Sequence, residues 1–195
     1  LGVSQLLCLR CLEAGCRAQY DPSIEWQLEE SATSQGPYFL PWLVGMPAET
    51  SLAICSMIFG GIFDRLPELK ICFAHGGGSF PGTLARIDKG YKARPDLCGV
   101  NGCKTPSEYL GQFYLDTLVH DPNNLEQLMA LVGVDKLALG SDYPFPLGED
   151  HPGAMITAMK SLSETQKDRM LGGTAWEFLG LDPGSFPEQR GGDSR

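Results

Sequence analysis

The sequence is poor in histidine and in basic side chains. Only three histidines occur among 195 residues, none of them lies before His75, and no His-x-His pair is present. This scarcity argues against a metal site built from closely spaced histidines of this chain alone. The 24 acidic residues outnumber the 15 basic ones, which gives a formal net charge of −9 at pH 7. The acidic balance argues against a nucleic-acid partner, which would favour a basic surface, and against attraction to an anionic membrane.

Long apolar runs and targeting signals are also absent. No run of 18 or more apolar residues occurs, so we expect no transmembrane span and no membrane partner. The short apolar stretch near Leu1 has no basic region before it, so we expect no secretory signal. Because the sequence does not begin with Met, we expect a fragment, an incomplete gene model or a processed product.

The seven cysteines form an odd, scattered set, which does not predict a disulfide framework. Free thiols are typical of a reducing compartment, so the sequence predicts a cytosolic location. Cys8 and Cys11 have the C-x-x-C spacing of some zinc and redox sites, and Cys16 follows them. A structural zinc site needs four ligands, and no second pair lies nearby. Free thiols are therefore the favoured interpretation of these three residues.

The chain divides into three parts by character. Residues 1–36 mix cysteines, charges and small polar residues without sustained periodicity, and we expect a divergent, poorly ordered leader. Residues 37–181 have a regular pattern and form the predicted domain. Residues 182–195 are rich in glycine, proline and charge, which predicts a disordered tail.

The regular part alternates short apolar runs with amphipathic stretches. The runs at 69–74, 113–119 and 136–140 predict strands buried on both faces. A largely buried helix is predicted to begin at Pro47, and further helices are predicted over 81–92, 122–132, 152–162 and 163–171, with a short one ending at Leu181. This alternation predicts an α/β fold with a parallel sheet. Three strands are too few to close a barrel.

Polar side chains follow the predicted strands, at the end where parallel α/β folds place their sites. His75 ends the first strand and precedes three glycines, which leave room for a substrate or for backbone. It is a candidate metal ligand or general base, or alternatively a hydrogen-bonded histidine on a tight turn. Asp142 follows the third strand and is a candidate metal ligand or proton acceptor. A carboxylate that caps the loop is the alternative.

Arg86 lies one turn into the helix after the glycine loop, where it could clamp a substrate carboxylate or simply face solvent. Asp121 is predicted to cap a helix, and His151 to be a surface or cap residue. The sequence does not settle the roles of Asp116 and His120.

The glycine loop matches neither of two better-known patterns. It lacks the G-x-G-x-x-G spacing of dinucleotide-binding loops, and no Walker pattern occurs. An HGGG oxyanion loop would need a G-x-S-x-G nucleophile elbow, which Gly140–Asp142 does not provide. Nucleotide binding and esterase activity are therefore not favoured.

Several strings together resemble the amidohydrolase-related, metal-dependent decarboxylases. These are Pro41–Thr50 (PWLVGMPAET), Cys72–Gly78 (CFAHGGG), Arg94–Cys98 (RPDLC) and Gly140–Phe145 (GSDYPF). The longer strings resemble one member of the family most closely. The resemblance covers residues 38–181 and implies that they form the carboxyl-terminal strands and helices of a TIM-like (β/α)₈ barrel.

The resemblance also implies a reaction and roles for particular residues. It implies a zinc-dependent, nonoxidative loss of carbon dioxide from a small dicarboxylate semialdehyde in tryptophan catabolism. Asp142 matches the zinc-binding aspartate of the last strand, and His75 matches the histidine that acts as base and acid. Arg86 matches an arginine that reaches the substrate of a neighbouring subunit, which implies a homodimer. The family's histidine ligands from earlier strands have no counterpart in this sequence.

Three hypotheses follow. The first is a truncated decarboxylase of this family, which lacks most of its zinc ligands. The second is a non-catalytic chain that pairs with an intact subunit. The third is an amidohydrolase-type decarboxylase of another aromatic acid, against which the longer strings argue.

Overall fold

The computed structural model describes residues 38–102, 104–182 and 184. At its centre is a parallel sheet with strand order β1-β2-β3, formed by Cys72–Phe73, Tyr114–Asp116 and Leu137–Ala138. Phe73 pairs with Leu115, and Leu115 pairs with Leu137. The predicted parallel α/β architecture is confirmed, although each strand is shorter than its apolar run.

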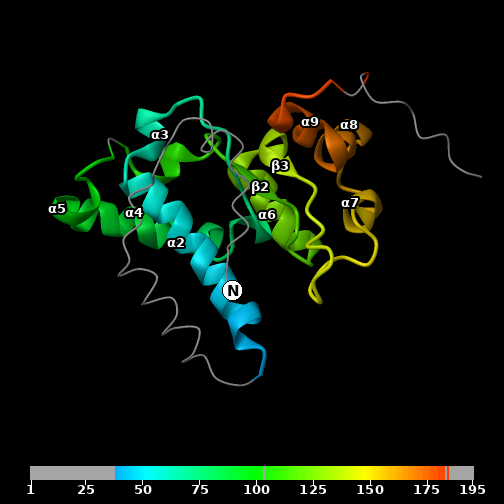
Figure 1. The fold of residues 1–195 in the computed structure, drawn as a ribbon, viewed down its shortest axis with the longest axis horizontal. Coiled ribbons are helices and arrows are strands. Elements are labelled where there is room, and N and C mark those ends of the chain that lie inside the picture. Colours follow the sequence, from blue (N-terminus) through cyan, green and yellow to red (C-terminus); the bar gives the residue numbers. More distant parts are fainter. Residues whose placement is uncertain (1–37, 103, 183, 185–195) are drawn as a thin grey trace, which may run out of the picture.

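Helical segments connect and flank the three strands (Figure 1). Helices α2 to α5 lie on one side of the sheet in this view, and α7 to α9 lie on the other. The segments before β2 are η1 (Pro41–Gly45), α2 (Met46–Phe59), α3 (Ile62–Arg65), η2 (His75–Gly77), α4 (Phe80–Ala93), α5 (Pro95–Cys98) and η3 (Pro106–Tyr109). Those after it are α6 (Pro122–Val132), η4 (Val134–Lys136), α7 (Ala154–Ala158), α8 (Glu164–Asp168), η5 (Arg169–Gly173) and α9 (Thr174–Leu179).

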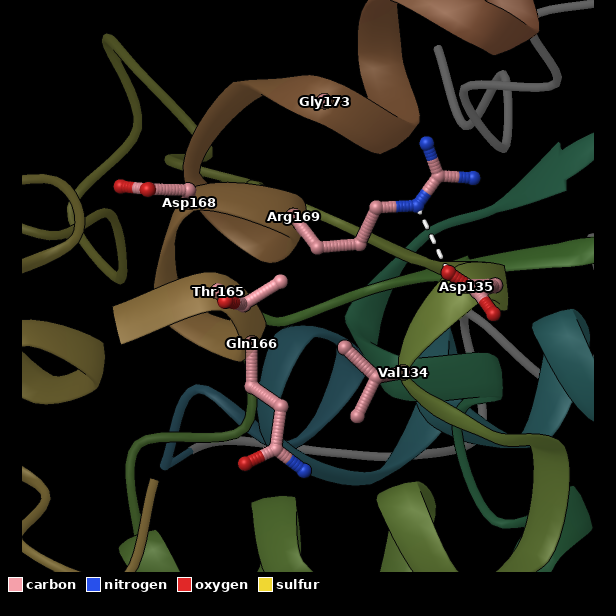
Figure 2. A pocket seen from close by; sticks show the side chains of 7 residues that line it. All are labelled: Val134, Asp135, Thr165, Gln166, Asp168, Arg169 and Gly173. Carbon is pink, nitrogen blue, oxygen red and sulfur yellow. Dashed lines mark hydrogen bonds and ion pairs between the residues drawn. The ribbon is translucent and has the colours of Figure 1, made fainter. Parts of the chain in front are cut away.

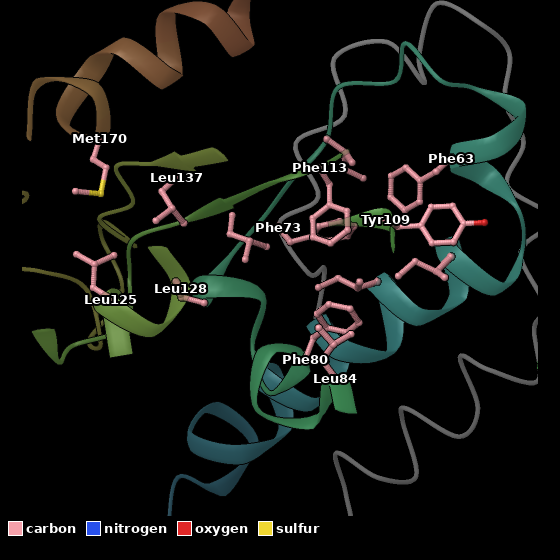
Figure 3. Close-up of a cluster of buried hydrophobic side chains, with 14 of the residues drawn as sticks. Phe63, Phe73, Phe80, Leu84, Tyr109, Phe113, Leu125, Leu128, Leu137 and Met170 are labelled. Atoms are coloured by element: carbon pink, nitrogen blue, oxygen red, sulfur yellow. The ribbon is translucent and has the colours of Figure 1, made fainter. Parts of the chain in front are cut away.

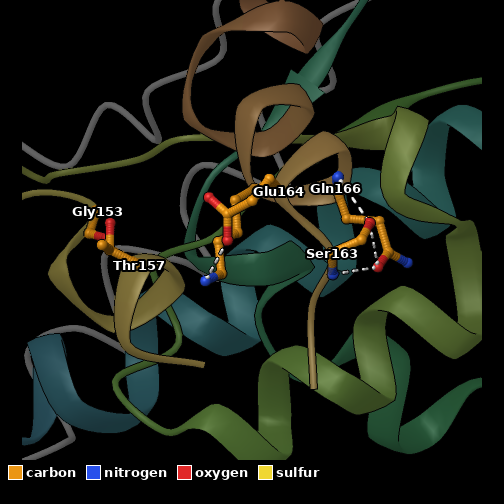
Figure 4. A network of polar contacts seen from close by, with 6 residues as sticks. Gly153, Thr157, Ser163, Glu164 and Gln166 are labelled. Carbon is orange, nitrogen blue, oxygen red and sulfur yellow. Dashed lines mark hydrogen bonds and ion pairs between the residues drawn. The ribbon is translucent and has the colours of Figure 1, made fainter. Parts of the chain in front are cut away.

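Local sequence explains where two of the helices begin. The Asp121 carboxylate accepts the N–H groups of Asn123 and Asn124 at 2.8 and 3.1 Å, which confirms the predicted cap of α6. Ser163 and Gln166 form a reciprocal capping box at the start of α8 (Figure 4). The Gln166 N–H donates to the Ser163 hydroxyl at 3.3 Å, and the Ser163 N–H donates to the Gln166 side chain at 3.0 Å. These caps satisfy N–H groups that a helix leaves unpaired at its first turn.

The buried core is centred on the sheet and is rich in aromatic side chains (Figure 3). Phe113, immediately before β2, is fully buried. Its ring centroid lies 5.6 Å from that of Phe63, 5.4 Å from that of Phe73 and 6.2 Å from that of Phe80. The Phe73 and Phe80 rings meet Phe113 edge-on, a favourable arrangement for aromatic quadrupoles. This cluster joins β1, α3 and α4 to the strand at the centre of the sheet.

The prediction that the helix after Pro47 is largely buried is wrong. Within α2 only Thr50, Ile54 and Ile58 are buried, and Leu52 is 56% exposed. The described elements pack against the side that carries Ile54 and Ile58, so the opposite side faces outward. By length and composition alone, Pro41–Phe59 could cross a membrane, since it has 19 residues and a mean hydropathy of 1.4. Core helices of globular proteins pass the same test, so this is weak evidence for a membrane span.

The remaining predictions concern the two ends of the chain and two of the later helices. The leader of residues 1–36, with Cys8, Cys11 and Cys16, lies outside the described residues, as does most of the tail from 182 to 195. The helix predicted over 152–162 is shorter in the structure (α7), and the one predicted over 163–171 is divided between α8 and η5.

Candidate active site

His75 and Asp142 lie together although 67 positions separate them in the sequence. His75 follows β1 and Asp142 follows β3, on either side of the central strand. The Nε2 atom of His75 lies 3.8 Å from an Oδ1 atom of Asp142, and the two side chains are only 20% and 10% exposed. Carboxyl ends of parallel strands meet at one edge of a sheet, which explains the convergence. The arrangement supports the prediction that these two residues belong to one site.

Both residues have an unusual backbone conformation. The φ angles of His75 and Asp142 are 57° and 53°, in the left-handed region that L residues seldom adopt. His120, which follows the central strand, also has a φ of 57°. Such conformations cost about 1–3 kcal/mol each and cluster at functional sites. The ends of all three strands therefore carry residues that the surrounding fold holds in unfavourable geometry.

The glycines after His75 are required by packing within the protein itself. A Cβ atom on Gly76 would lie 2.4 Å from the Val119 side chain, and one on Gly78 would lie 2.1 Å from the Pro47 carbonyl oxygen. Both glycines also have positive φ angles. The sequence suggested that these glycines leave room either for a substrate or for the backbone. The structure supports the second reason, because atoms of the protein itself lie where the Cβ atoms would be. The loop after β1 therefore packs closely against α2 and against the segment after β2.

Asp116 is one of the two residues whose roles the sequence left open, and its side chain faces the His75 loop. One carboxylate oxygen, Oδ1, accepts the Gly76 N–H at 2.8 Å and the Leu118 N–H at 3.1 Å. Burial raises the pKa of this carboxyl group, although these backbone donors and His75 act in the opposite direction. An acidic residue inside an apolar strand was the only sequence signal for this role, and it did not show which way the side chain points.

The remaining candidates have exposed side chains. His120 and His151 are exposed, and the surface position predicted for His151 is confirmed. Arg86 is exposed on α4 and makes no hydrogen bond or ion pair with the described residues. Its guanidinium group is thus available to a ligand or to another chain, but no contact here assigns its role.

The described residues do not by themselves form a metal site. They contain no group of three or more histidine, cysteine, aspartate or glutamate side chains placed to hold a metal ion. Asp142 offers one carboxylate beside one imidazole, whereas tetrahedral zinc needs three or four protein ligands. The buried Nδ1 atom of His75 has no hydrogen-bond partner in the described part of the chain. The imidazole therefore retains an unsatisfied polar atom next to the candidate ligand.

A surface depression of about 440 Å³ lies elsewhere, between η4 and the segment that spans α8 and η5 (Figure 2). It is lined by Val134, Asp135, Thr165, Gln166, Asp168, Arg169 and Gly173. Arg169 spans it to contact Asp135, with Nε 2.8 Å from Oδ1. Because η4 precedes β3, this depression lies at the amino end of the strand, where parallel α/β folds seldom place catalysis. The His75–Asp142 pair is therefore the stronger candidate.

Most of the chain is similar to known enzymes. The profile of the amidohydrolase family matches residues 10–181. The chain is 62% identical over 149 residues to 2-amino-3-carboxymuconate-6-semialdehyde decarboxylase of Dictyostelium discoideum, which covers 76% of this chain and 42% of that protein. The chain thus spans about two-fifths of the length of this relative.

Two solved structures with a similar fold are decarboxylases. One is 5-carboxyvanillate decarboxylase from Sphingomonas paucimobilis, which is 28% identical to this chain and superposes with a TM-score of 0.61. The match covers 71% of this chain and 42% of that one. A 5-carboxyvanillate decarboxylase from Novosphingobium aromaticivorans, complexed with manganese and 4-hydroxy-3-methoxy-5-nitrobenzoic acid, has 24% identity and a TM-score of 0.62 over 83% of this chain and 44% of that one. The partial barrel predicted from the sequence is confirmed by this likeness and by the three-stranded parallel sheet.

Proposed function

The chain belongs to the amidohydrolase family, and we propose that it forms the carboxyl-terminal part of a decarboxylase acting on 2-amino-3-carboxymuconate 6-semialdehyde. The product would be 2-aminomuconate 6-semialdehyde, formed in tryptophan catabolism on a branch away from quinolinate. The observation that carries the proposal is the convergence of His75 and Asp142 at the carboxyl end of the sheet. The identity of 62% to a relative of that name favours this substrate over the aromatic acids of structures at 28% identity or less.

The reaction needs a group that can transfer a proton, and we assign this role to His75. Nonoxidative decarboxylation breaks a carbon–carbon bond, releases carbon dioxide and leaves an electron pair on the substrate carbon, which then takes up a proton. Imidazole gains and loses a proton near neutral pH, which suits it to general acid–base catalysis. The unsatisfied Nδ1 atom and the nearby Asp142 carboxylate support a functional role for this ring.

Arg86 is proposed to bind a substrate carboxylate in a neighbouring subunit of a homodimer. Its exposure on α4 and the lack of a partner for its side chain among the described residues support this role. A guanidinium group can bind a carboxylate through two parallel hydrogen bonds. The substrate is a small dicarboxylate, so a binding arginine suits its chemistry.

Zinc is the metal proposed for the complete site, with Asp142 as the ligand that this chain contributes. The manganese bound in a related decarboxylase supports a metal in general terms. Further ligands have to come from outside the described residues. The cytosolic location stays a prediction from the sequence.

Two assays test the proposal. The first measures the loss of freshly generated 2-amino-3-carboxymuconate 6-semialdehyde when the purified chain is added with zinc. We expect no turnover, because the ligand set among the described residues is incomplete. The second uses a chimera, in which residues 38–181 of this chain replace the matching segment of the Dictyostelium discoideum relative. We expect this chimera to release carbon dioxide from the same substrate.

Variants of the chimera assign the chemistry to individual residues. We expect His75→Asn to lower kcat about 100-fold or more, the range of a lost general acid–base group. His151→Asn, at an exposed histidine, is the matched control and should retain full activity. A folded chimera that shows no turnover would overturn the proposed substrate. Equal activity of the two histidine variants would overturn the role of His75.

A further inference from the structure

Asp116 connects the two loops that carry the candidate site. It ends β2, the central strand, whose neighbours β1 and β3 lead to His75 and Asp142. Its Oδ1 atom accepts the N–H of Gly76, the residue directly after His75, at 2.8 Å. The same atom accepts the Leu118 N–H at 3.1 Å, which ties the side chain back to its own strand end.

The other oxygen of the carboxylate lies against the end of β3. A Cβ atom on Gly140 would lie 2.7 Å from the Oδ2 atom of Asp116 and 2.8 Å from its Cβ and Cγ atoms. Gly140 precedes Asp142 by two positions, so the Asp116 side chain occupies the space beside that loop. One side chain thus touches the segment directly after His75 and the segment directly before Asp142.

Burying the Asp116 carboxylate costs free energy unless its hydrogen bonds compensate for the lost contact with water. Removing an ionisable group from water disfavours its charged form, whereas an apolar side chain would be buried without that cost. The two N–H groups that Asp116 accepts would otherwise lack a partner inside the fold. His75 also has a φ of 57°, so its loop needs a contact that stabilises this unfavourable conformation.

We propose that Asp116 is a positioning residue, which fixes the Gly76 peptide and thereby directs the His75 imidazole toward Asp142. This inference rests on the proposed function in one respect, namely that His75 is the residue that transfers the proton. Asp116 acts through the backbone of the loop and needs no contact with the substrate. The hydrogen-bonding oxygen matters for this role more than the negative charge.

Nuclear magnetic resonance of the full, purified chain tests the proposal without measuring turnover. Three variants are compared with the unsubstituted chain: Asp116→Ala, Asp116→Asn and Asp88→Ala. Asparagine keeps an oxygen that can accept both N–H groups, whereas alanine removes it. Asp88 is the matched control, because its carboxylate accepts the backbone N–H of Ser107 at 3.0 Å in a different part of the fold.

In Asp116→Ala we expect the Gly76 amide hydrogen to exchange about five- to tenfold faster, as for the loss of one hydrogen bond. The ring signals of His75 should move, while those of His151 stay in place. Asp116→Asn should restore both readouts to near their original values. Asp88→Ala should leave Gly76 and His75 unchanged, which separates a local effect from a general loss of stability.

Unchanged Gly76 exchange and His75 ring signals in Asp116→Ala would overturn the proposal. So would an Asp116→Asn variant that behaves like Asp116→Ala. If Asp116→Ala does not fold, the carboxyl carbon signal of Asp116 in the unsubstituted chain decides the question. Replacing the Gly76 amide hydrogen with deuterium shifts that signal only if the N–H donates to the carboxylate, so no shift refutes the contact. A failed decarboxylase assay would leave these results intact.

Discussion

Truncation of Phe113 to alanine tests whether the aromatic cluster holds the sheet together. Phe113 is fully buried, and its ring meets those of Phe63, Phe73 and Phe80 at centroid distances of 5.4 to 6.2 Å. Buried phenylalanine-to-alanine changes cost about 3–5 kcal/mol, the sum of lost transfer free energy and a residual cavity. Three aromatic neighbours make collapse of the cavity difficult, so we expect a loss of about 4 kcal/mol. That is a large part of the 5–15 kcal/mol typical of a folded domain.

Equilibrium urea denaturation followed by circular dichroism measures this loss. The matched control is Phe145→Ala, since Phe145 is 47% exposed and lies outside the cluster. We expect the control to change the free energy of unfolding by no more than about 0.5 kcal/mol. The midpoint should fall for Phe113→Ala while the slope stays the same. A loss below about 1.5 kcal/mol, or equal losses in the two variants, would refute the view that this cluster stabilises the sheet.

Three further predictions concern other regions. Gly78→Ala should destabilise the fold by about 2 kcal/mol or more, since the new Cβ would lie 2.1 Å from the Pro47 carbonyl oxygen at a positive φ; an unchanged melting temperature would contradict this. Arg169 holds the pKa of Glu177 below its usual value; Arg169→Ala should therefore cost at most about 1 kcal/mol at pH 7, with the difference disappearing as the pH falls below 4.5 through the lowered pKa. Equal differences at pH 7 and pH 3 in urea denaturation would argue against this ion pair. Burial raises the pKa of the Cys72 thiol to about 12, so iodoacetamide should modify it much more slowly in the folded chain than in urea at pH 8, as mass spectrometry can show.

Several features of the fold and site were predictable because they depend on short stretches of sequence. An aspartate followed by proline predicts the start of α6, and Asp121 caps that helix in the structure. Apolar runs between amphipathic stretches predict buried parallel strands, and all three occur. His75 and Asp142 were identified because parallel strands present their carboxyl ends at one edge of the sheet.

Tertiary structure alone decided how these parts meet. The 3.8 Å separation between His75 and Asp142 depends on the twist and register of three strands. The direction of the Asp116 side chain depends on the path of the glycine loop, which no local pattern specifies. The exposed side of α2 depends on which elements pack against it, so its apolar composition alone led to a wrong prediction. Sequence patterns report the preferences of neighbouring residues, whereas contacts between distant residues form only when the whole chain packs.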